Sequence, residues 1–244
     1  MCESRDQLFA KPLDNLEKFV FDDSVASVFP DMISRSVPGY KTLIDHSGQL
    51  AAKFARQKSK CYDLGCSLGA TTIALERNLT CEDIQIIAVD NSPAMIARFK
   101  RDIEARSEGI PIVVKEADVC EVSINDASVV IMNFTLQFVS PEKRKNLLRS
   151  IYDGMMSGGC LIISEKVSME PFKLDNLMVD AHHQFKRMQG YSDLEVSQKR
   201  DSLENVLIPE TLEKHFARLQ EIGFDLVTTW FQCYNFYSLL AIKQ

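Results

Sequence analysis

The chain lacks any hydrophobic run long enough to cross a bilayer. Its most apolar stretches, residues 84–89 and 129–134, are far shorter than the roughly 20 apolar residues that a membrane-spanning helix needs. Residues 1–6 contain neither the basic region nor the apolar core that are typical of a secretory signal. We therefore expect a cytoplasmic protein that does not engage a membrane.

The sequence also lacks paired cysteines. An odd number of cysteines without C-x-x-C spacing argues against both a disulfide framework and a zinc site, and it favours a reducing compartment. His182 and His183 are adjacent, but neighbouring residues on a helix point about 100° apart and do not easily face one ion. We expect these two histidines to pack or to contact substrate, and we predict no metal. The seven cysteines are at positions 2, 61, 66, 81, 120, 160 and 233.

An excess of positive charge is missing too. The chain carries 28 Lys and Arg against 34 Asp and Glu, which gives a formal net charge of −6, and it has no long basic tract. Proteins that bind nucleic acids usually present a basic face, because neutralising phosphates supplies most of their non-specific affinity. We therefore expect no direct binding of nucleic acid, and small molecules are the favoured ligands.

What the sequence does contain is a regular alternation of strands and helices. Its 244 residues, 45% of them hydrophobic, suit a single α/β domain over residues 1–244, with a helical lead-in at 1–58. Helices are predicted at 70–78, from Pro93, and from Pro141 to a stop at Gly158-Gly159. The alternation predicts βαβ units and a parallel sheet. The strands predicted in this part are residues 61–64, 84–89, 112–115, 129–132 and 160–164.

The alternation lapses after residue 166. Residues 171–222 are predicted to form three helical pieces, which break near Gly190 and Pro209. The last two predicted strands, 226–231 and 236–242, are only a few residues apart, which indicates an antiparallel hairpin at a sheet edge. The predicted fold is therefore α/β and Rossmann-like, with a seven-stranded, mostly parallel sheet. A helical insertion at about 171–209 precedes the hairpin and could act as a lid.

The strongest local motif is the glycine-containing loop at residues 63–69, Asp-Leu-Gly-Cys-Ser-Leu-Gly, between a predicted strand and a predicted helix. Small residues let the backbone approach a ligand closely, and a helix N-terminus offers free N–H groups. The loop has only two glycines, with Ser67 where a third might stand. A tight turn that binds no ligand is therefore the alternative interpretation.

Polar residues follow the next three strands. Asp90 lies 25 residues after Gly65, where a carboxylate can accept hydrogen bonds from both hydroxyls of a ribose, although it could instead be a turn residue or a helix cap. Asp118 and Asn133 follow the third and fourth strands. Ligands of open parallel sheets bind outside the carboxyl ends of the strands, so these residues predict one binding lip.

Together these residues resemble the class I methyltransferases. A nicotinamide-dependent dehydrogenase competes as an interpretation, but it usually has G-x-G-x-x-G and a different arrangement of strands. By the resemblance, the glycine loop would contact the methionine end of S-adenosylmethionine, and Asp90 would bind the ribose. Asp118 and the following valine would bind the adenine. The contacts that this resemblance implies are Gly65, Cys66, Ser67, Asp90, Asn91, Asp118, Val119 and Asn133.

A closer resemblance, from about residue 7 to the C-terminus, is to the carboxy-S-adenosyl-L-methionine synthase family. Generic methyltransferases share the glycine loop but lack the Ser-Gln-Lys-Arg segment and the Phe-Gln-Cys hairpin. Departures such as Cys120 and Glu121 fall where no reaction role is assigned. The segments that carry the resemblance are VFPDMISRSVPGY (28–40), YDLGCSLGATT (62–72), VDNSPAMI (89–96), MNFTLQF (132–138), ISEK (163–166), HHQFKRMQGYSDLEVSQKR (182–200) and TTWFQCYNFYS (228–238).

The resemblance implies an activity and partners. It implies conversion of S-adenosylmethionine and prephenate to carboxy-S-adenosylmethionine and phenylpyruvate, in a homodimer. The product would serve a separate transferase that completes 5-oxyacetyl uridine at the tRNA wobble position. Tyr40 would belong to the cofactor cradle by the same resemblance. The hydroxide and carbon dioxide released from prephenate would do the chemistry, so excluding water matters more than a protein base.

Arg200 is the candidate for recognising the added carboxylate. Guanidinium binds carboxylate through two parallel hydrogen bonds and stays charged, although a lone arginine on a helix is more often simply solvated. The fourth strand ends Asn133-Phe134-Thr135-Leu136, which matches neither the Asn-Pro-Pro-Tyr of amine methyltransferases nor a nucleophilic cysteine motif. A conventional methyltransferase acting on a small metabolite or tRNA, and a non-catalytic S-adenosylmethionine-binding partner, remain the alternatives.

Overall fold

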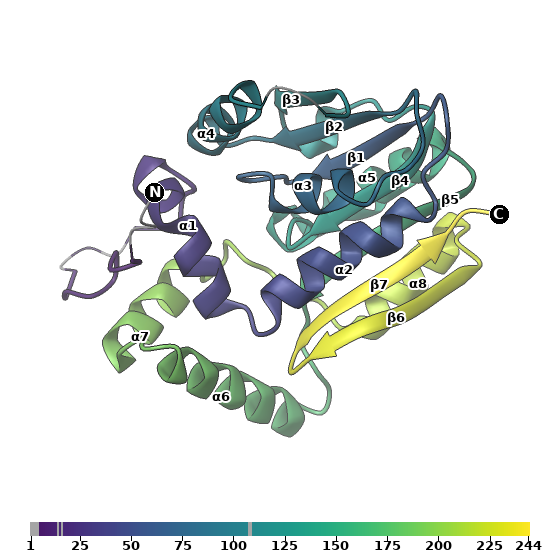
Figure 1. Cartoon of the computed structure of the whole chain (residues 1–244). Coiled ribbons are helices and arrows are strands. Elements are labelled where there is room, and N and C mark those ends of the chain that lie inside the picture. The colour runs from purple at the N-terminus through teal and green to yellow at the C-terminus, as the bar shows by residue number, and fades with distance from the viewer. Residues whose placement is uncertain (1–4, 14, 16, 107–108) are drawn as a thin grey trace.

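The computed structural model describes residues 5–13, 15, 17–106 and 109–244. These residues form a seven-stranded sheet in the order β3-β2-β1-β4-β5-β7-β6 (Figure 1). The first five strands run parallel, and β7 pairs antiparallel with both β5 and β6. The predicted α/β fold with its antiparallel C-terminal hairpin is confirmed. The strands are β1 (Lys60–Leu64), β2 (Gln85–Asp90), β3 (Ile112–Glu116), β4 (Ala127–Asn133), β5 (Met155–Lys166), β6 (Leu226–Cys233) and β7 (Phe236–Ile242).

Helices cover both faces of the sheet and extend beyond one end of it. Figure 1 shows α1, α6 and α7 beside the sheet, beyond the end at which β1 finishes. The helices α6, α7 and α8 are the three predicted pieces of residues 171–222. Among the described residues, no helix is long and apolar enough to span a membrane. The helices are α1 (Asp23–Ser36), α2 (Tyr40–Ala52), α3 (Ala70–Glu76), α4 (Pro93–Glu104), α5 (Pro141–Gly154), α6 (Phe172–Met188), α7 (Asp193–Ser202) and α8 (Leu212–Ile222), with 3₁₀ turns η1 (Val119–Glu121) and η2 (Leu136–Phe138).

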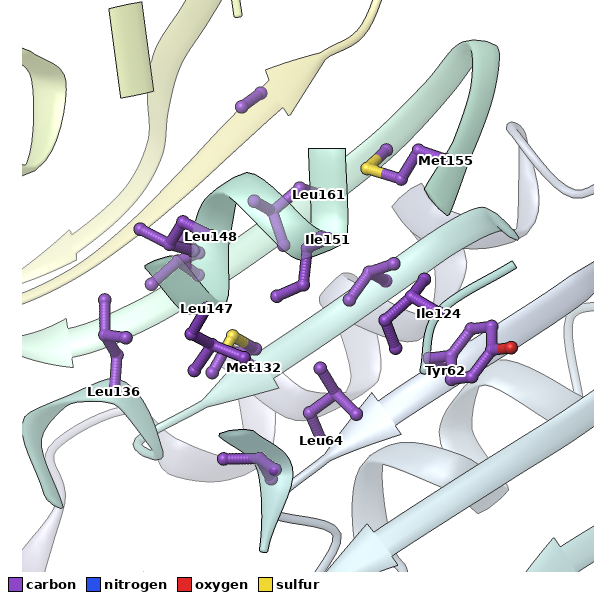
Figure 2. Packing of buried hydrophobic residues seen from close by; sticks show 14 of the residues in the cluster. Tyr62, Leu64, Ile124, Met132, Leu136, Leu147, Leu148, Ile151, Met155 and Leu161 are labelled. Atoms are coloured by element: carbon purple, nitrogen blue, oxygen red, sulfur yellow. The ribbon is translucent and has the colours of Figure 1, made fainter. Parts of the chain in front are cut away.

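The core lies on both faces of the central strands, which is why these strands appear in the sequence as continuous apolar runs. On one face, Leu64 of β1 and Met132 of β4 pack with α5, whose Leu148 and Ile151 are buried (Figure 2). On the other face, Cys61 packs in a second cluster beneath α2 and α3. Because successive side chains of a strand point to opposite faces, the buried sheet contributes to two cores, one on each face.

The N-terminal lead-in is helical only in α1 and α2. The prediction of helix is wrong over the described part of residues 5–22, which form no helix. The backbone of this segment bonds elsewhere: Leu13 N–H donates to the side-chain oxygen of Gln198, and Phe19 N–H donates to Ser202 O. Both partners belong to α7, so long-range contacts replace the local bonds that a helix requires.

The helix stop at Gly158-Gly159 was also predicted wrongly. Helix α5 ends at Gly154, and both glycines lie inside β5. Their backbones pair with the end of the chain, because Gly158 N–H donates to Lys243 O and Lys243 N–H donates to Gly159 O. Glycines that the sequence presents as a stop therefore extend a strand.

The contact between α2 and α3 gives a test of this packing. A Cβ atom at Gly48 would lie 2.5 Å from the backbone carbonyl carbon of Ala74. We expect Gly48→Ala to lower the free energy of unfolding by about 1–3 kcal/mol, because overpacking exceeds the gain in helix propensity. Urea unfolding measures this, and Thr42→Ala on the exposed face of α2 is the control. An unchanged midpoint for Gly48→Ala would contradict the packing.

Candidate active site

A large cavity opens at the carboxyl ends of the parallel strands, where α1, α6 and α7 close over it. Its volume is about 920 Å³, which is ample for a nucleotide-sized ligand. Every residue that the sequence predicts for the site lines this cavity. These residues are Tyr40, Gly65, Cys66, Ser67, Asp90, Asn91, Asp118, Val119, Asn133 and Arg200.

The strand order sets the order of side chains along the lip of the cavity. Neighbouring strands β3, β2, β1, β4 and β5 deliver, in that order, Asp118, Asp90, Gly65, Asn133 and Lys166 at or just beyond their ends. The sequence presents these residues in a different order, because β1 lies in the middle of the parallel strands. Acidic residues therefore lie at one end of the lip and a lysine at the other.

Gly65 occupies a position that no larger residue can fill. Its φ is +82°, and a Cβ atom there would lie 2.0 Å from Thr135 Oγ1. The N–H groups of Gly65 and Cys66 both donate to Val89 O, at 2.8 and 2.9 Å. These two N–H groups are therefore occupied by protein, and they are not those of the helix N-terminus, because α3 begins at Ala70. Because Gly65 has no side chain, a ligand can approach the backbone of the loop closely.

Asp90 has the geometry of a ribose acceptor. Its Oδ2 accepts from Ser67 N–H at 2.8 Å, and its Oδ1 accepts from Ser92 N–H at 2.9 Å. Each carboxylate oxygen can accept a further hydrogen bond, so the pair can meet two neighbouring hydroxyls. Burial raises the pKa of Asp90, against the opposing effect of its backbone donors. The carboxylate is thus fixed in orientation before any ligand binds.

A second buried acid and an aromatic wall complete this part of the site. Asp63 is 1% exposed and accepts from Thr72 Oγ1 at 2.6 Å, and burial raises its pKa to about 7. Tyr40 opens α2, and its ring centroid lies 6.3 Å from that of Phe134. Burial, and then the nearby Asp63, raise the pKa of the Tyr40 hydroxyl. Tyr40 is therefore a neutral aromatic surface on the cavity wall.

Asn133 is fully engaged with its neighbours. Its side-chain nitrogen donates to Ser47 Oγ at 3.2 Å and to Thr71 Oγ1 at 3.0 Å. Its side-chain oxygen accepts from Ser164 Oγ at 2.6 Å. These contacts join the end of β4 to α2, α3 and β5. Asn133 therefore holds the elements of the lip together.

Asp118 and Val119 lie just beyond β3. The Asp118 side chain accepts from Cys120 N–H at 2.9 Å and so caps η1. Val119 is 8% exposed and contributes an apolar contact beside that cap. This pairing of an acceptor with an apolar surface suits a flat heterocycle with a polar edge.

Arg200 reaches the cavity from α7 but is paired within its own helix. Its Nε donates to Asp201 Oδ1 at 2.9 Å, and the side chain is 60% exposed. Both Arg200 and Asp201 line the cavity. The guanidinium is thus within the site while its charge is balanced by an adjacent carboxylate.

Relatives of known activity match this chain over nearly its whole length. The chain is 52% identical over 239 residues to the carboxy-S-adenosyl-L-methionine synthase of Photorhabdus laumondii, covering 98% of this chain and 95% of that enzyme. It is 51% identical to that of Photobacterium profundum, covering 98% of each. The chain belongs to the carboxy-S-adenosyl-L-methionine synthase family. Residues 61–159 also match the family described as a methyltransferase domain.

Solved structures resemble this family member in fold. A putative S-adenosyl-L-methionine-dependent methyltransferase from Methanococcus maripaludis has a TM-score of 0.61 and 21% identity, covering 96% of this chain and 98% of that one. The magnesium protoporphyrin IX methyltransferase of Synechocystis with bound SAH has a TM-score of 0.58 and 15% identity, covering 84% of each chain. At these identities the likeness concerns the fold, which is that of class I methyltransferases.

Glu165 is a buried acid behind the cavity wall that the sequence did not single out. It is 3% exposed, and its two carboxylate oxygens accept from Leu136 and Gln137 N–H, each at 2.9 Å. Burial raises the pKa of Glu165 to about 8. The residue holds the turn after β4, which forms part of the cavity wall. An acid at the end of an apolar strand, in the segment ISEK, was the available signal.

A group of buried lysines was also missed. Lys166, Lys186 and Lys199 all line the cavity, and the last two are 6% and 7% exposed. Burial and the neighbouring Lys199 lower the pKa of Lys186 to about 7, and burial lowers that of Lys199 to about 8. Lys186 lies four residues after His182 on α6, so both fall on the same buried face, and this spacing could have indicated it.

His182 and His183 both line the cavity, and His182 also packs against its neighbours. His182 Nε2 lies 2.7 Å from Ser36 O and donates to it, and its ring centroid lies 4.9 Å from that of Phe236. Burial, then the charges of Lys186 and Lys166, lower the pKa of His182 to about 2. In the described part of the chain, no group of three or more His, Cys, Asp or Glu is arranged to hold a metal ion.

The lowered pKa of His182 gives a pH-dependent prediction. Below about pH 6.5 the unfolded chain protonates this histidine while the folded protein does not, so the free energy of unfolding falls as the pH falls. His182→Gln keeps an N–H donor without a titrating ring. We expect its loss of stability between about pH 6.5 and 5 to be smaller by roughly 1–2 kcal/mol, measured by urea unfolding.

The exposed His46 supplies the matched control for that measurement. His46→Gln should reproduce the pH dependence of the unsubstituted protein. If the free energy of unfolding changed equally with pH in His182→Gln and in the unsubstituted protein, the buried ring would be protonated in the folded state.

Proposed function

We propose that this enzyme transfers a carboxyl group from prephenate to the S-methyl group of S-adenosylmethionine, forming carboxy-S-adenosylmethionine and phenylpyruvate. The observation that carries the proposal is the identity of 52% and 51% to synthases of this product over 98% of the chain. The cavity at the strand ends supports it, because it combines a nucleotide lip with a basic wall.

The lip fits S-adenosylmethionine. Asp90 binds the ribose hydroxyls, the loop at Gly65 lets the methionine end approach the backbone, and Asp118 with Val119 receives the adenine. Gly65 already lies against Thr135, so any side chain there would be excluded by protein as well as by ligand. The full set of proposed contacts is Tyr40, Gly65, Cys66, Ser67, Asp90, Asn91, Asp118, Val119 and Asn133, in which Asn133 acts by positioning its neighbours.

The reaction balances without a protein base. Prephenate loses its ring carboxyl group as carbon dioxide and its ring hydroxyl as hydroxide, and the ring aromatises to phenylpyruvate. The hydroxide takes a proton from the S-methyl group and becomes water, and the methyl carbon then bonds to carbon dioxide. The protein's part is to hold both molecules and to exclude bulk water. The helices α6 and α7, which contribute to the cavity wall, provide that cover.

Arg200 recognises the new carboxylate. A guanidinium can hold it through two parallel hydrogen bonds beside the positive sulfonium. To do so, Arg200 breaks its ion pair with Asp201 and binds the carboxylate of the product instead. The homodimer allows either subunit's arginine to serve a given cavity.

The product is a carboxymethyl donor for a second enzyme. A separate tRNA uridine carboxymethyltransferase uses it to complete 5-oxyacetyl uridine at the wobble position, so this chain needs no tRNA contact of its own. We place the enzyme in the cytoplasm, where that tRNA resides. The six cysteines of the described residues are all free, which suits a reducing compartment.

Substitution of Arg200 tests the proposal. We expect Arg200→Ala to abolish carboxylated product in assays with S-adenosylmethionine and prephenate, measured by mass spectrometry, while S-adenosylmethionine binding remains measurable by calorimetry. Arg101→Ala, an exposed arginine on α4, is the control and should retain full turnover. Unchanged turnover in Arg200→Ala would remove its assigned role.

The unsubstituted enzyme distinguishes the alternatives in the same assay. Formation of demethylated cofactor, followed with a labelled methyl group, would support a conventional methyltransferase. Retention of S-adenosylmethionine without any prephenate-dependent product would support a non-catalytic binding partner.

We also propose that the enzyme is a homodimer and that the outer face of α6 takes part in the interface. Leu174, Leu177 and Met188 fall within about 60° of one another around this helix and are 44%, 57% and 77% exposed. Phe172, at the start of α6, is 75% exposed. Large apolar side chains gathered on one helix face are typical of an interaction site.

Sedimentation equilibrium tests the dimer. We expect the unsubstituted chain to sediment with twice the chain mass and Leu177→Glu/Met188→Glu to sediment as a monomer, because two charges would be desolvated at the interface. Lys173→Gln, an exposed change on the same helix, should leave the dimer intact. A monomeric unsubstituted protein, or a dimeric double variant, would contradict this interface.

A further inference from the structure

Two ammonium groups in the cavity have no protein partner among the described residues. Lys186, on α6, is 6% exposed, and Lys166 ends β5. Within the described part of the chain, neither ammonium group donates a hydrogen bond or lies in an ion pair. Lys199 differs, because its Nζ donates to Ser36 Oγ at 3.1 Å. Keeping an unpaired charge away from water is costly, and Lys186 is buried while Lys166 is partly buried, so a site that holds both favours an anion.

Two acids act on these lysines without removing this deficit. Asp6 raises the pKa of Lys186, but burial and the neighbouring lysines lower it more strongly. Asp175 raises the pKa of Lys166, but burial lowers it more strongly. The Oδ1 of Asp175 accepts from Met169 N–H at 2.8 Å, which fixes this carboxylate at the start of α6. Lys166 therefore remains without a salt-bridge partner in the described structure.

Acidic and basic side chains lie at opposite ends of the cavity. Asp118 and Asp90 follow β3 and β2 at one end of the lip, whereas Lys166 follows β5 at the other. Beyond β5, α6 and α7 add Lys186 and Lys199 to the basic end. The two ends are separated by Gly65 and Asn133, on the central strands. One cavity therefore presents an acidic half and a basic half.

The two proposed substrates have complementary charges. S-adenosylmethionine at neutral pH carries a sulfonium, an ammonium and one carboxylate, so its net charge is positive and its adenosine suits the acidic half. Prephenate is a dianion with carboxylates on the ring and on the pyruvyl side chain. Opposite charges attract strongly where the surroundings exclude water, so the basic half suits the dianion.

We propose that Lys166 and Lys186 form the subsite that binds the carboxylate groups of the second substrate, a small dianion. This inference rests on the proposed function. It separates two tasks at the basic end: the lysines hold the carboxyl donor, and Arg200 holds the carboxyl group after transfer.

The protonation of Lys186 supports this assignment. Its pKa is lowered to about 7 by burial first, and then by the neighbouring positive charges of Lys199 and Lys166. A bound dianion opposes both effects, because it replaces lost solvation and neutralises the repulsion. A lysine with a lowered pKa that lines a cavity and has no structural partner is a candidate ligand-binding residue.

The experiment measures the two substrates separately in Lys186→Gln and Lys166→Gln. We expect the KM for prephenate to rise about 10- to 100-fold in each, the factor that follows from losing one hydrogen bond to a charged group. The Kd for S-adenosylmethionine, measured by calorimetry, should stay unchanged. The thermal midpoint should not fall, because each substitution removes an unpaired buried charge. Lys173→Gln, on the exposed face of α6, should match the unsubstituted enzyme in all three measurements.

Other results overturn the proposal in distinguishable ways. Normal KM for prephenate in both variants, with carboxylated product still formed, would reject the subsite and leave the proposed function standing. A raised Kd for S-adenosylmethionine would assign the lysines to the methionine carboxylate instead. Absence of carboxylated product from the unsubstituted enzyme would reject the proposed function, and the subsite with it.

Discussion

The carbonyl oxygen of Val89 accepts hydrogen bonds from both Gly65 and Cys66, and the arrangement of the cavity depends on this contact. It ties the loop after β1 to the end of β2. Asp90, the next residue, completes the connection by accepting from Ser67 N–H. Asp90 and the glycine loop are thus parts of one hydrogen-bonded unit. A site built this way loses little conformational entropy when a nucleotide binds, because its parts are already in place.

A second set of buried polar groups fixes the opposite wall. Glu165 accepts from the backbone N–H groups that open η2. Arg144, 1% exposed, donates to Gln137 O, Val139 O and Glu210, and so secures the turn on its other side. Buried charges are tolerated when their hydrogen bonds are satisfied. The cavity is therefore framed by satisfied ionic groups, in contrast to the unpaired lysines that face into it.

Much of the fold could be predicted because apolar runs and turn residues are local signals. The strands, the helices after residue 60 and the closing hairpin follow from such patterns, except that α5 ends earlier and β5 begins earlier than the glycines indicate. The lip could be predicted as well, because parallel strands end at the same edge of a sheet. The described part of residues 5–22 could not, since the backbone N–H groups of Leu13 and Phe19 bond to α7, far away in the sequence.

The basic half of the cavity was missed for a different physical reason. A lysine on a helix is ordinarily solvated, and only tertiary packing shows that Lys186 is buried. The part played by Asn133 was similarly hidden. Its position at a strand end was evident, but its three hydrogen bonds to hydroxyl groups depend on α2, α3 and β5 meeting there.

The pairing of Arg200 with Asp201 has a consequence for turnover. An arginine that must leave one carboxylate before it takes another binds the second only by the difference between the two interactions. Asp201 therefore competes with any anion that binds Arg200, and it lowers the affinity of Arg200 for that anion. If Arg200 binds the carboxylate of the product as proposed, Asp201 favours release of the product, because it pairs with the arginine again as the product leaves.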